Sequence, residues 1–354
     1  MTHSSERPGT NRSVTLQDIA DRCGVSLITA SRALRNDRRN VSQQNIERIS
    51  AVAREMGYDA SSHHDARRMS LRKHGVRVQS HIVALFMPNL FMEYLYHASL
   101  FRGVSSVLLQ ERYGTLLLDI KQTMEDADLP LVFARGDIDG LITLVKSDEK
   151  EMISFVRRVA TLHGAPPLPT VNLIEPMEGA SVVLADDQGG AYAAARHLLA
   201  LGHRSIVICT HENYPHQQRL LGYRQAYREA GLPEKELHVL PWDSQPNELL
   251  AVLRQYPTIT AVQASNDVEA QLIARTLAAQ GYRVPEDISL IGYDDTDPLP
   301  NGHENILTSV HLPLIEIGLE GARLLLRHIT DHDFQPTTVV LPTTLMVRKS
   351  TAPP

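Results

Sequence analysis

The sequence predicts an N-terminal three-helix head of the helix-turn-helix type, followed by an α/β body built on two doubly wound parallel sheets. The chain has 354 residues, more than one ordinary domain of about 100–200 residues. Residues 1–80 contain 14 Lys and Arg against 8 Asp and Glu, whereas the remainder contains 21 against 33. The apolar pattern also changes near residue 80, from three short helical periodicities to alternating strands and helices. A basic head on an acidic body is typical of a head that contacts phosphates and a body that does not.

Three short helices are expected within residues 14–60. Thr15 caps the start of the first, and Gly24 ends it, because glycine readily takes the left-handed conformation of a sharp turn. Ser26 begins the second helix and Ser42 the third. The apolar positions at helical spacing are Leu16, Ile19, Ala20, Cys23, Ala30, Ala33, Leu34, Ile46, Ile49, Ala53 and Met56. This unit has the size of a helix-turn-helix domain.

The segments that flank the head are polar. Residues 1–13 form a tail without the apolar core of a secretory signal, and residues 61–80 form a basic linker that we expect to become helical when bound. No apolar run approaches the roughly 18 residues of a membrane span. Cys23 and Cys209 lie far apart, outside any disulfide or zinc pattern. We therefore expect a cytoplasmic protein without a membrane segment, a metal or a cofactor.

Strands and helices alternate over residues 81–348, after which residues 349–354 form a short tail. The strand-like runs are HIVALFMP, GTLLLDI, DGLITLV, PTVNLI, SVVLAD, SIVICT, TAVQAS and ISLIGYD. Amphipathic stretches such as GGAYAAARHLLALG and DVEAQLIARTLAAQG separate them. Continuous apolar strands between such helices favour parallel sheets that are covered on both faces. The length of the body favours two lobes, with ligands binding at the carboxyl ends of the strands.

Longer motifs carry a resemblance that spans about residues 14–348. VTLQDIADRCGVSLITASRALRN and VSQQNIERISAVAREMGYD resemble the head of the LacI-type (lactose repressor) family of bacterial transcription regulators. HLLALGHRSIVI, RLLGYRQAYREAGL and ISLIGYDD follow in the order of that family. The resemblance implies a body similar to periplasmic sugar-binding proteins, whose two lobes exchange strands three times. It places one lobe at residues 81–185 with 311–334, and the other at 186–310 with 335–348.

Residues 26–34 are the expected recognition helix, which would lie in the major groove of DNA. Arg32 matches the Ser-Arg pair of the family and can donate two hydrogen bonds to guanine or hold a phosphate; the alternative is a solvated face. Short hydroxyl side chains suit phosphate oxygens, although they also cap helices. Those in suitable positions are Thr15, Ser26, Thr29 and Ser31.

Leu27 and Ile28 stand where the family usually places its variable base readers. Aliphatic groups cannot hydrogen-bond to a base edge, but they pack on the methyl group of thymine. The alternative is that they are core residues, yet two adjacent residues cannot both face a core already formed by Ala30, Ala33 and Leu34. We expect a thymine-bearing half-site.

The linker departs from the family pattern, in which Pro-Asn follows a Gly-Tyr pair. Here Gly57-Tyr58 is followed by DASS. The run ARRM resembles the hinge helix of the family if two extra residues are allowed, so that Met69 becomes the wedge in the minor groove and Arg67 and Arg68 lie near phosphates. The preceding HHD run lacks a fourth ligand and is interpreted as solvated linker, not as a metal site.

Four residues of the body are the main candidates for effector contacts, and one of them, Arg219, matches an arginine that binds the effector in the family. Arg219 is expected to reach hydroxyls or a carboxylate, and Asp294 to accept two hydroxyl bonds; their alternatives are a surface ion pair and a loop cap. Asn266 binds the effector or caps the following helix, and Trp242, the only tryptophan, stacks on a sugar face or packs in the core. Asn89, Phe91 and Tyr94 complete the expected site.

These observations predict a dimeric, ligand-responsive repressor that a sugar or sugar acid releases from a palindromic operator in double-stranded DNA. Segments 92–109 and 311–330 are expected in the dimer interface. No catalytic motif such as GxSxG, a P-loop or HExxH is present, so an enzyme is not expected. The alternatives are a corepressor-activated repressor, an activator or a nucleoside sensor. A solute-binding protein, or an enzyme with a DNA-binding appendage, remains a more distant alternative.

Overall fold

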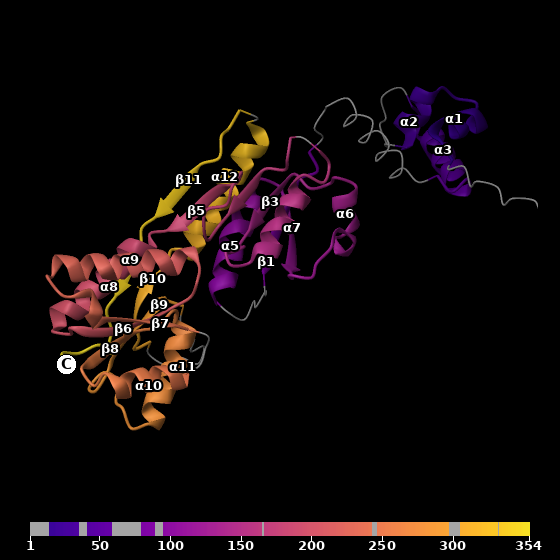
Figure 1. Ribbon diagram of the computed structural model, residues 1–354. Helices are drawn as coiled ribbons and strands as arrows, with labels where there is room; N and C mark the ends of the chain where they lie inside the picture. The colour runs from indigo at the N-terminus through magenta and orange to yellow at the C-terminus, as the bar shows by residue number, and fades with distance from the viewer. Residues whose placement is uncertain are drawn as a thin grey trace, which may run out of the picture. The chain divides into compact units, whose positions relative to one another are not determined.

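The computed structural model comprises two compact units, Met1–Val78 and Gln79–Pro354, which are described separately (Figure 1). The structure describes residues 14–34, 41–58, 79–88, 95–164, 166–242, 246–296, 305–331 and 333–354. Some predicted site residues lie outside the described residues, as does the HHD run. They are Arg67, Arg68, Met69, Asn89, Phe91 and Tyr94.

The head contains the three expected helices. Thr15 caps α1 in a capping box with Asp18, and Gly24 ends that helix in the left-handed conformation at a φ of 64°. The bounds are α1 Leu16–Cys23, α2 Leu27–Leu34 and α3 Gln43–Glu55. A single apolar cluster joins the helices, and its buried members are Ile19, Cys23, Ala33, Val41, Ile46, Ile49 and Ala53. The prediction of a helix-turn-helix head is confirmed.

The body contains two six-stranded sheets, as the alternation of strands and helices predicts. The first has the order β11-β5-β4-β3-β1-β2, and all its pairings are parallel. The second has the order β12-β10-β9-β8-β6-β7, and only the β10–β12 pairing is antiparallel. The strands of the first sheet are β1 Ile82–Pro88, β2 Gly114–Ile120, β3 Gly140–Thr143, β4 Thr170–Asn172, β5 Ser181–Ala185 and β11 Thr338–Leu341. Those of the second are β6 Ser205–Thr210, β7 Leu237–Pro241, β8 Ile259–Gln263, β9 Ser289–Asp294, β10 Thr308–His311 and β12 Thr344–Met346.

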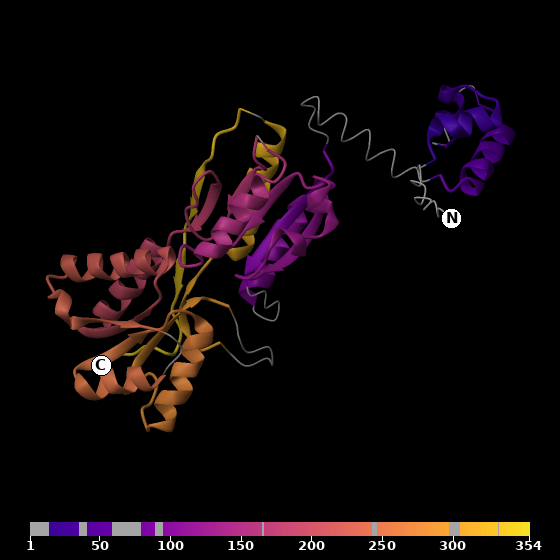
Figure 2. The same cartoon turned by 45° about the vertical axis from the view of Figure 1, so that its right-hand side comes forward.

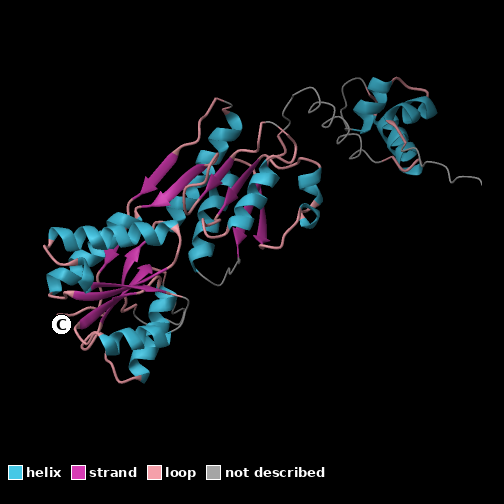
Figure 3. Ribbon diagram, viewed as in Figure 1, coloured by secondary structure: helices cyan, strands magenta, loops and turns pink. Residues whose placement is uncertain are grey.

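Helices cover both faces of each sheet (Figure 3). The helices that pack on the first sheet are α5 Leu95–Gln110, α6 Leu131–Ala134, α7 Lys150–Ala160 and α12 Leu314–Thr330. The helices that pack on the second sheet are α8 Asp187–Leu201, α9 Tyr214–Glu229, α10 Pro246–Gln255 and α11 Asp267–Ala279. Short 3₁₀ turns occur at Asp126–Asp128 and Glu234–Glu236. Among the described residues, no helix has the length and apolar content needed to cross a membrane.

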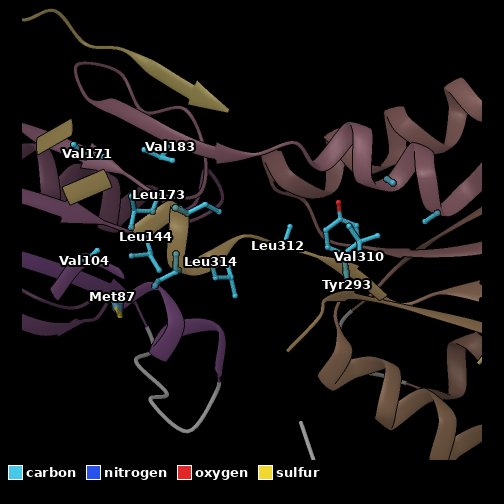
Figure 4. Close-up of a cluster of buried hydrophobic side chains, with 14 of the residues drawn as sticks. Met87, Val104, Leu144, Val171, Leu173, Val183, Tyr293, Val310, Leu312 and Leu314 are labelled. Carbon is cyan, nitrogen blue, oxygen red and sulfur yellow. The ribbon is translucent and has the colours of Figure 1, made fainter. Parts of the chain in front are cut away.

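The chain crosses between the lobes three times. The crossings follow β5, β10 and β11, so the late elements α12 and β11, drawn in yellow, lie beside the early strands of the first sheet (Figure 1, Figure 2). At the second crossing the apolar core is continuous: Leu312 lies between Val310 of the second lobe and Leu314 of the first (Figure 4). Packing at this crossing therefore couples the two lobes.

The third crossing differs in position from the sequence expectation, which assigns residues 335–348 to the second lobe. Thr338 pairs with Val182 and Leu341 with Ala185, so β11 belongs to the first sheet and the chain crosses only before β12. The half-exposed pattern of β11 is that of an edge strand. Such a pattern predicts a strand but does not indicate which sheet the strand joins.

The last residues of the chain are part of the second lobe, although the sequence predicts a short tail there. Ser350 is buried, and its carbonyl accepts the N–H of Leu290 at 2.8 Å. The N–H of Ala352 donates to the hydroxyl of Ser289 at 3.0 Å. Strand β9 is therefore hydrogen-bonded to the C-terminal residues of the chain as well as to β8 and β10.

Helices α5 and α12 approach each other closely because glycines face glycines. A Cβ on Gly103 would lie 2.1 Å from the carbonyl oxygen of Ile315, and one on Gly318 would lie 2.3 Å from that of Leu100. The two segments expected in a dimer interface therefore already pack on each other within one chain.

Candidate DNA-binding and effector-binding sites

The start of α2 presents two aliphatic side chains to solvent. Leu27 is 44% exposed and Ile28 is 64% exposed, which contradicts the alternative that they are core residues. The buried residues of this helix are Ala30 and Ala33. An exposed apolar pair at the first turn of the second helix is a surface available for contact.

The hydroxyl side chains expected near phosphates stabilise the helix ends. The N–H of Thr29 donates to the hydroxyl of Ser26 at 3.2 Å, and the two hydroxyls lie 2.8 Å apart. Thr15 accepts the N–H of Asp18 at 3.2 Å, and the Asp18 carboxylate accepts the N–H of Thr15 at 2.7 Å. Capping is therefore one role of these side chains. Ser31 and Arg32 are half-buried on the same helix.

Arg219 is the centre of the candidate effector site. It lies on α9, is buried, and donates from Nε to Asp187 Oδ1 at 2.7 Å. Its Nη1 donates to the carbonyl of Ser265 at 2.7 Å, and its guanidinium lies 3.5 Å from the ring centroid of Tyr293. Burial disfavours the charge, but Asp187, Tyr293 and Asp294 together outweigh this effect and raise the pKa of Arg219. The alternative for Arg219, a surface ion pair, is wrong, because its ion pair with Asp187 is buried.

Asp294 lies at the carboxyl end of β9, as predicted. Its Oδ1 is 4.0 Å from Arg219 Nη2, and its backbone has a φ of 95°, which is unusual for a residue other than glycine. Burial, reinforced by the carboxylates of Asp187 and Glu269, raises the pKa of Asp294 to about 7 against the opposing effect of Arg219. Arg219 offsets only part of the cost of burying the ionised carboxylate of Asp294. This carboxylate therefore readily accepts a hydrogen bond from a hydroxyl group.

Asn266 and Trp242 follow the alternative roles given for them. Asn266 Oδ1 accepts the N–H of Glu269 at 2.8 Å and so caps α11. Trp242 is buried in the apolar cluster of the second lobe, with Leu249 and Leu253. Its Nε1 has no partner among the described residues.

The first lobe contributes polar groups that sequence reasoning missed. Tyr96 is half-buried on α5, and its pKa is raised by burial and by the carboxylates of Asp294 and Asp187. Glu175 of the first lobe accepts the N–H of Tyr214, at the start of α9 in the second lobe, at 3.2 Å. Burial raises the pKa of Glu175.

Asn172 and Asp187 are two further polar residues near strand ends that sequence reasoning missed. Asn172 ends β4, and its amide donates to the carbonyls of Val145 at 3.0 Å and Glu175 at 2.8 Å. Asp187 follows β5 by two residues. Polar residues at the carboxyl ends of parallel strands share one edge of the sheet, so this position in the sequence is a usable signal.

Buried polar atoms without a hydrogen-bond partner gather at the same strand ends. Leaving such an atom unpaired costs about 1–3 kcal/mol, so a concentration of them is typical of a site that a polar ligand satisfies. Within the described residues these atoms are Thr143 Oγ1, Asn172 Oδ1, His216 Nε2, Trp242 Nε1, Ser265 Oγ, Asp267 Oδ2 and Glu269 Oε2. Their residues end β3 and β4 of the first sheet or follow β6, β7 and β8 of the second.

A helix-turn-helix head and a two-lobed body with a polar site at its strand ends together define a class of protein. It is the class of DNA-binding transcriptional regulators that respond to a small ligand.

Comparison with known proteins identifies the family within this class. Residues 15–61 match the model of the bacterial regulatory proteins of the lacI family, and residues 195–351 match that of the periplasmic binding protein-like domain. The HTH-type transcriptional regulator CelR of Thermobifida fusca is 31% identical over 347 residues, which cover 96% of this chain and 98% of that protein. The chain therefore belongs to the LacI family of bacterial transcription regulators, and the resemblance of its motifs is confirmed.

Two solved structures are similar to this one along most of their length. A CelR–cellobiose complex has a TM-score of 0.65 and 27% identity, covering 95% of this chain and 99% of that one. A LacI family regulator from Enterococcus faecium with bound ribose has a TM-score of 0.63 and 27% identity, covering 77% of this chain and 99% of that one. The prediction of a two-lobe body is confirmed by this likeness and by the two sheets.

Proposed function

We propose that this chain is a cytoplasmic homodimeric repressor, without enzymatic activity, that a small sugar releases from a near-palindromic operator. The observation that carries the effector site is the buried group formed by Arg219, Asp187 and Asp294 at the carboxyl ends of the strands. Relatives with bound cellobiose and ribose support a carbohydrate as the effector. The sugar binds between groups of both lobes, with Tyr96 on the first and Asp294 on the second.

The head reads the operator through α2. Leu27 and Ile28 pack on thymine methyl groups, and Arg32 donates to guanine or to a phosphate. The hydroxyl side chains that cap the helix starts also bind phosphate oxygens and so fix the position of the head along the DNA. The corresponding role of Arg67, Arg68 and Met69 in the minor groove remains a prediction from the sequence.

The homodimer aligns two heads with the two halves of the operator. Helices α5 and α12 form the interface, and α5 offers the exposed apolar side chains Leu95 and Leu109 for it. Two-fold symmetry of the protein then matches the symmetry of the DNA.

The test combines operator selection with a ligand response. Genomic fragments retained by the full chain at low salt are identified, and their affinity is measured by fluorescence anisotropy with and without sugars. We expect the wild-type chain to lose affinity for its fragment when a sugar binds. The Asp294→Asn variant should keep its DNA affinity but lose this response, whereas Glu248→Gln, at an exposed position on α10, should behave like the wild type. Retention of no fragment across salt conditions would exclude the proposal.

A further inference from the structure

The chain enters the body at Ser80 and His81, immediately before β1. The buried carboxylate of Asp139 accepts hydrogen bonds from three groups of these two residues. The N–H of Ser80 lies 2.9 Å from both Oδ1 and Oδ2, its hydroxyl donates to Oδ1 at 2.8 Å, and the N–H of His81 donates to Oδ2 at 2.7 Å. Hydrogen bonds to a carboxylate are roughly twice as strong as those between neutral groups. Asp139 therefore anchors the residues that lead into the first lobe.

The backbone of His81 is fixed from a second side. Its φ of 56° lies in the left-handed region, which residues other than glycine seldom adopt. The carbonyl of His81 accepts the N–H of Gly114 at 2.7 Å, and its ring centroid lies 4.9 Å from that of Tyr113. Such a conformation persists where the surroundings determine it. These contacts and the Asp139 carboxylate together fix the backbone at the entry to the body.

Asp139 is itself held by the first sheet. It immediately precedes β3, and its N–H donates at 2.8 Å to the carbonyl of Ile82, the first residue of β1. Strands β1 and β3 pair in parallel, so the anchor lies at their amino ends. The polar residues of the candidate effector site, such as Asn172 on β4, lie at the carboxyl ends of the strands. The anchor is therefore separate from that site and belongs to the edge of the lobe where the chain enters.

Resting on the proposed homodimer, we propose that Asp139 is a positioning residue for DNA recognition: it fixes the end of the linker to the first lobe and so sets the separation of half-sites that the two heads can span. Two heads joined through dimerised bodies bind DNA as a bivalent unit, whose effective concentration depends on the length of the linkers.

The length that the anchor removes from the linker is comparable to the spacing of base pairs. Release of Ser80 and His81 adds about 7 Å of extended chain to each linker. One extra base pair moves the half-sites apart by about 3.4 Å and turns one against the other by about 35°. Linkers lengthened at both protomers therefore accommodate a change of one base pair that the anchored linkers oppose.

Operators of altered spacing test the proposal on the full-length protein. The genomic fragment retained by the wild type is prepared with its own spacing, with one base pair inserted or deleted at its centre, and as a single half-site. Fluorescence anisotropy measures the affinity for each fragment. We expect the wild type to prefer its own spacing by at least about tenfold, whereas Asp139→Asn should bind the three spacings within about threefold. The physical reason is that the variant replaces one acceptor oxygen by an amide group that cannot accept. Asp333→Asn, at an exposed position after α12 on the same lobe, should behave like the wild type.

Two further variants separate loss of the anchor from general damage. Insertion of Gly-Ser before Gln79 lengthens the linker and leaves the anchor intact, so it should reproduce the loss of spacing preference. Ser80→Ala removes one donor group and keeps both backbone donors, so its spacing preference should be intermediate. This variant carries the test if Asp139→Asn melts below the wild type. All variants should bind the single half-site like the wild type, because their heads are unchanged.

The outcomes distinguish this inference from the proposed function. The inference is overturned if Asp139→Asn, or Ser80→Ala in its place, keeps the full wild-type preference for spacing. It is also overturned if the affinity for the single half-site falls equally, or if the wild type does not distinguish the spacings. In these cases the wild type still binds its fragment, and the proposed function stands. If the wild type retains no fragment, the proposed function is overturned and the inference with it.

Discussion

Replacement of Asp294 by Asn should change how the stability of the protein depends on pH. The pKa of this carboxyl is raised to about 7 from the ordinary 3.8, because it is buried near the carboxylates of Asp187 and Glu269. The folded protein therefore holds a proton that the unfolded chain releases. Since the folded state binds more protons, stability is fully present below about pH 4 and is lost as pH rises to about 7.

The magnitude follows from the size of the shift. Three pKa units at about 1.4 kcal/mol each make ionised Asp294 about 4 kcal/mol less favourable in the folded protein than the neutral form. Most of this change falls between pH 4 and pH 7, where it amounts to about 3 kcal/mol. The titratable and charged groups that interact with Asp294 are Arg219, Lys146, Asp187, Glu269, Asp267, Tyr96 and Tyr293. These residues are present in both proteins, but Asp267, whose pKa of about 8 is raised partly by Asp294, loses that contribution in the variant.

Denaturant unfolding of the ligand-free protein at several pH values measures the effect. Asp294→Asn should gain stability relative to the wild type from pH 5 to about pH 7, and the gain should level off above pH 7. Asp287→Asn is the matched control, because hydrogen bonds from Arg283 lower the pKa of Asp287 to about 2 and keep it ionised over this range. The control should shift stability by the same amount at every pH. A difference between Asp294→Asn and the wild type that is equally flat, or that falls with pH, would refute the reasoning.

Three further predictions concern packing, capping and base reading. Gly318→Ala places a Cβ 2.3 Å from the carbonyl oxygen of Leu100, so thermal melting should show a loss of about 1–3 kcal/mol, while Gly114→Ala, whose Cβ comes no closer than 3.7 Å, should stay within about 0.5 kcal/mol. Thr15→Ala removes the capping box of α1, so hydrogen exchange in that helix should accelerate by an amount equivalent to about 1 kcal/mol. Ile28→Gln should move the selected half-site from thymine towards adenine, and an unchanged selected sequence would contradict contact between Ile28 and the base.

The fold was predictable because its elements are local. The helical periodicity in the head and the alternation in the body both report which side chains face a core, and this is a property of neighbouring residues. The position of β11 was not predictable in this way. Its partner β5 lies more than 150 residues earlier, and only the pairing of Thr338 with Val182 decides its sheet.

The sequence predicts those residues of the candidate site that stand in a motif or at a strand end. It does not predict residues whose role depends on a hydrogen-bond partner elsewhere in the chain. Arg219 and Asp294 stand in motifs and at a strand end, and the structure brings their side chains within 4.0 Å of each other. Asp187 was missed because its role depends on an arginine 32 residues later. Glu175 was missed because its hydrogen-bond partner lies in the other lobe. Asn266 and Trp242 carry residue types that serve capping and core packing equally well, and residue type alone does not separate these roles.

Several energetically costly features lie at the carboxyl ends of the strands. Asp294 has a positive φ and a carboxyl that ionises at a cost, and buried polar atoms nearby lack partners. Such departures are tolerated where a ligand later compensates them. A ligand present at about a hundred times its dissociation constant stabilises the state it binds by about 2.7 kcal/mol. It changes DNA affinity only if it binds the two arrangements of the lobes unequally. A ligand that contacted only Arg219 and Asp294 would stabilise the second lobe but would bind both arrangements of the lobes equally. The proposed regulation therefore requires contacts on the first lobe as well, for which Tyr96 and Glu175 are the candidates.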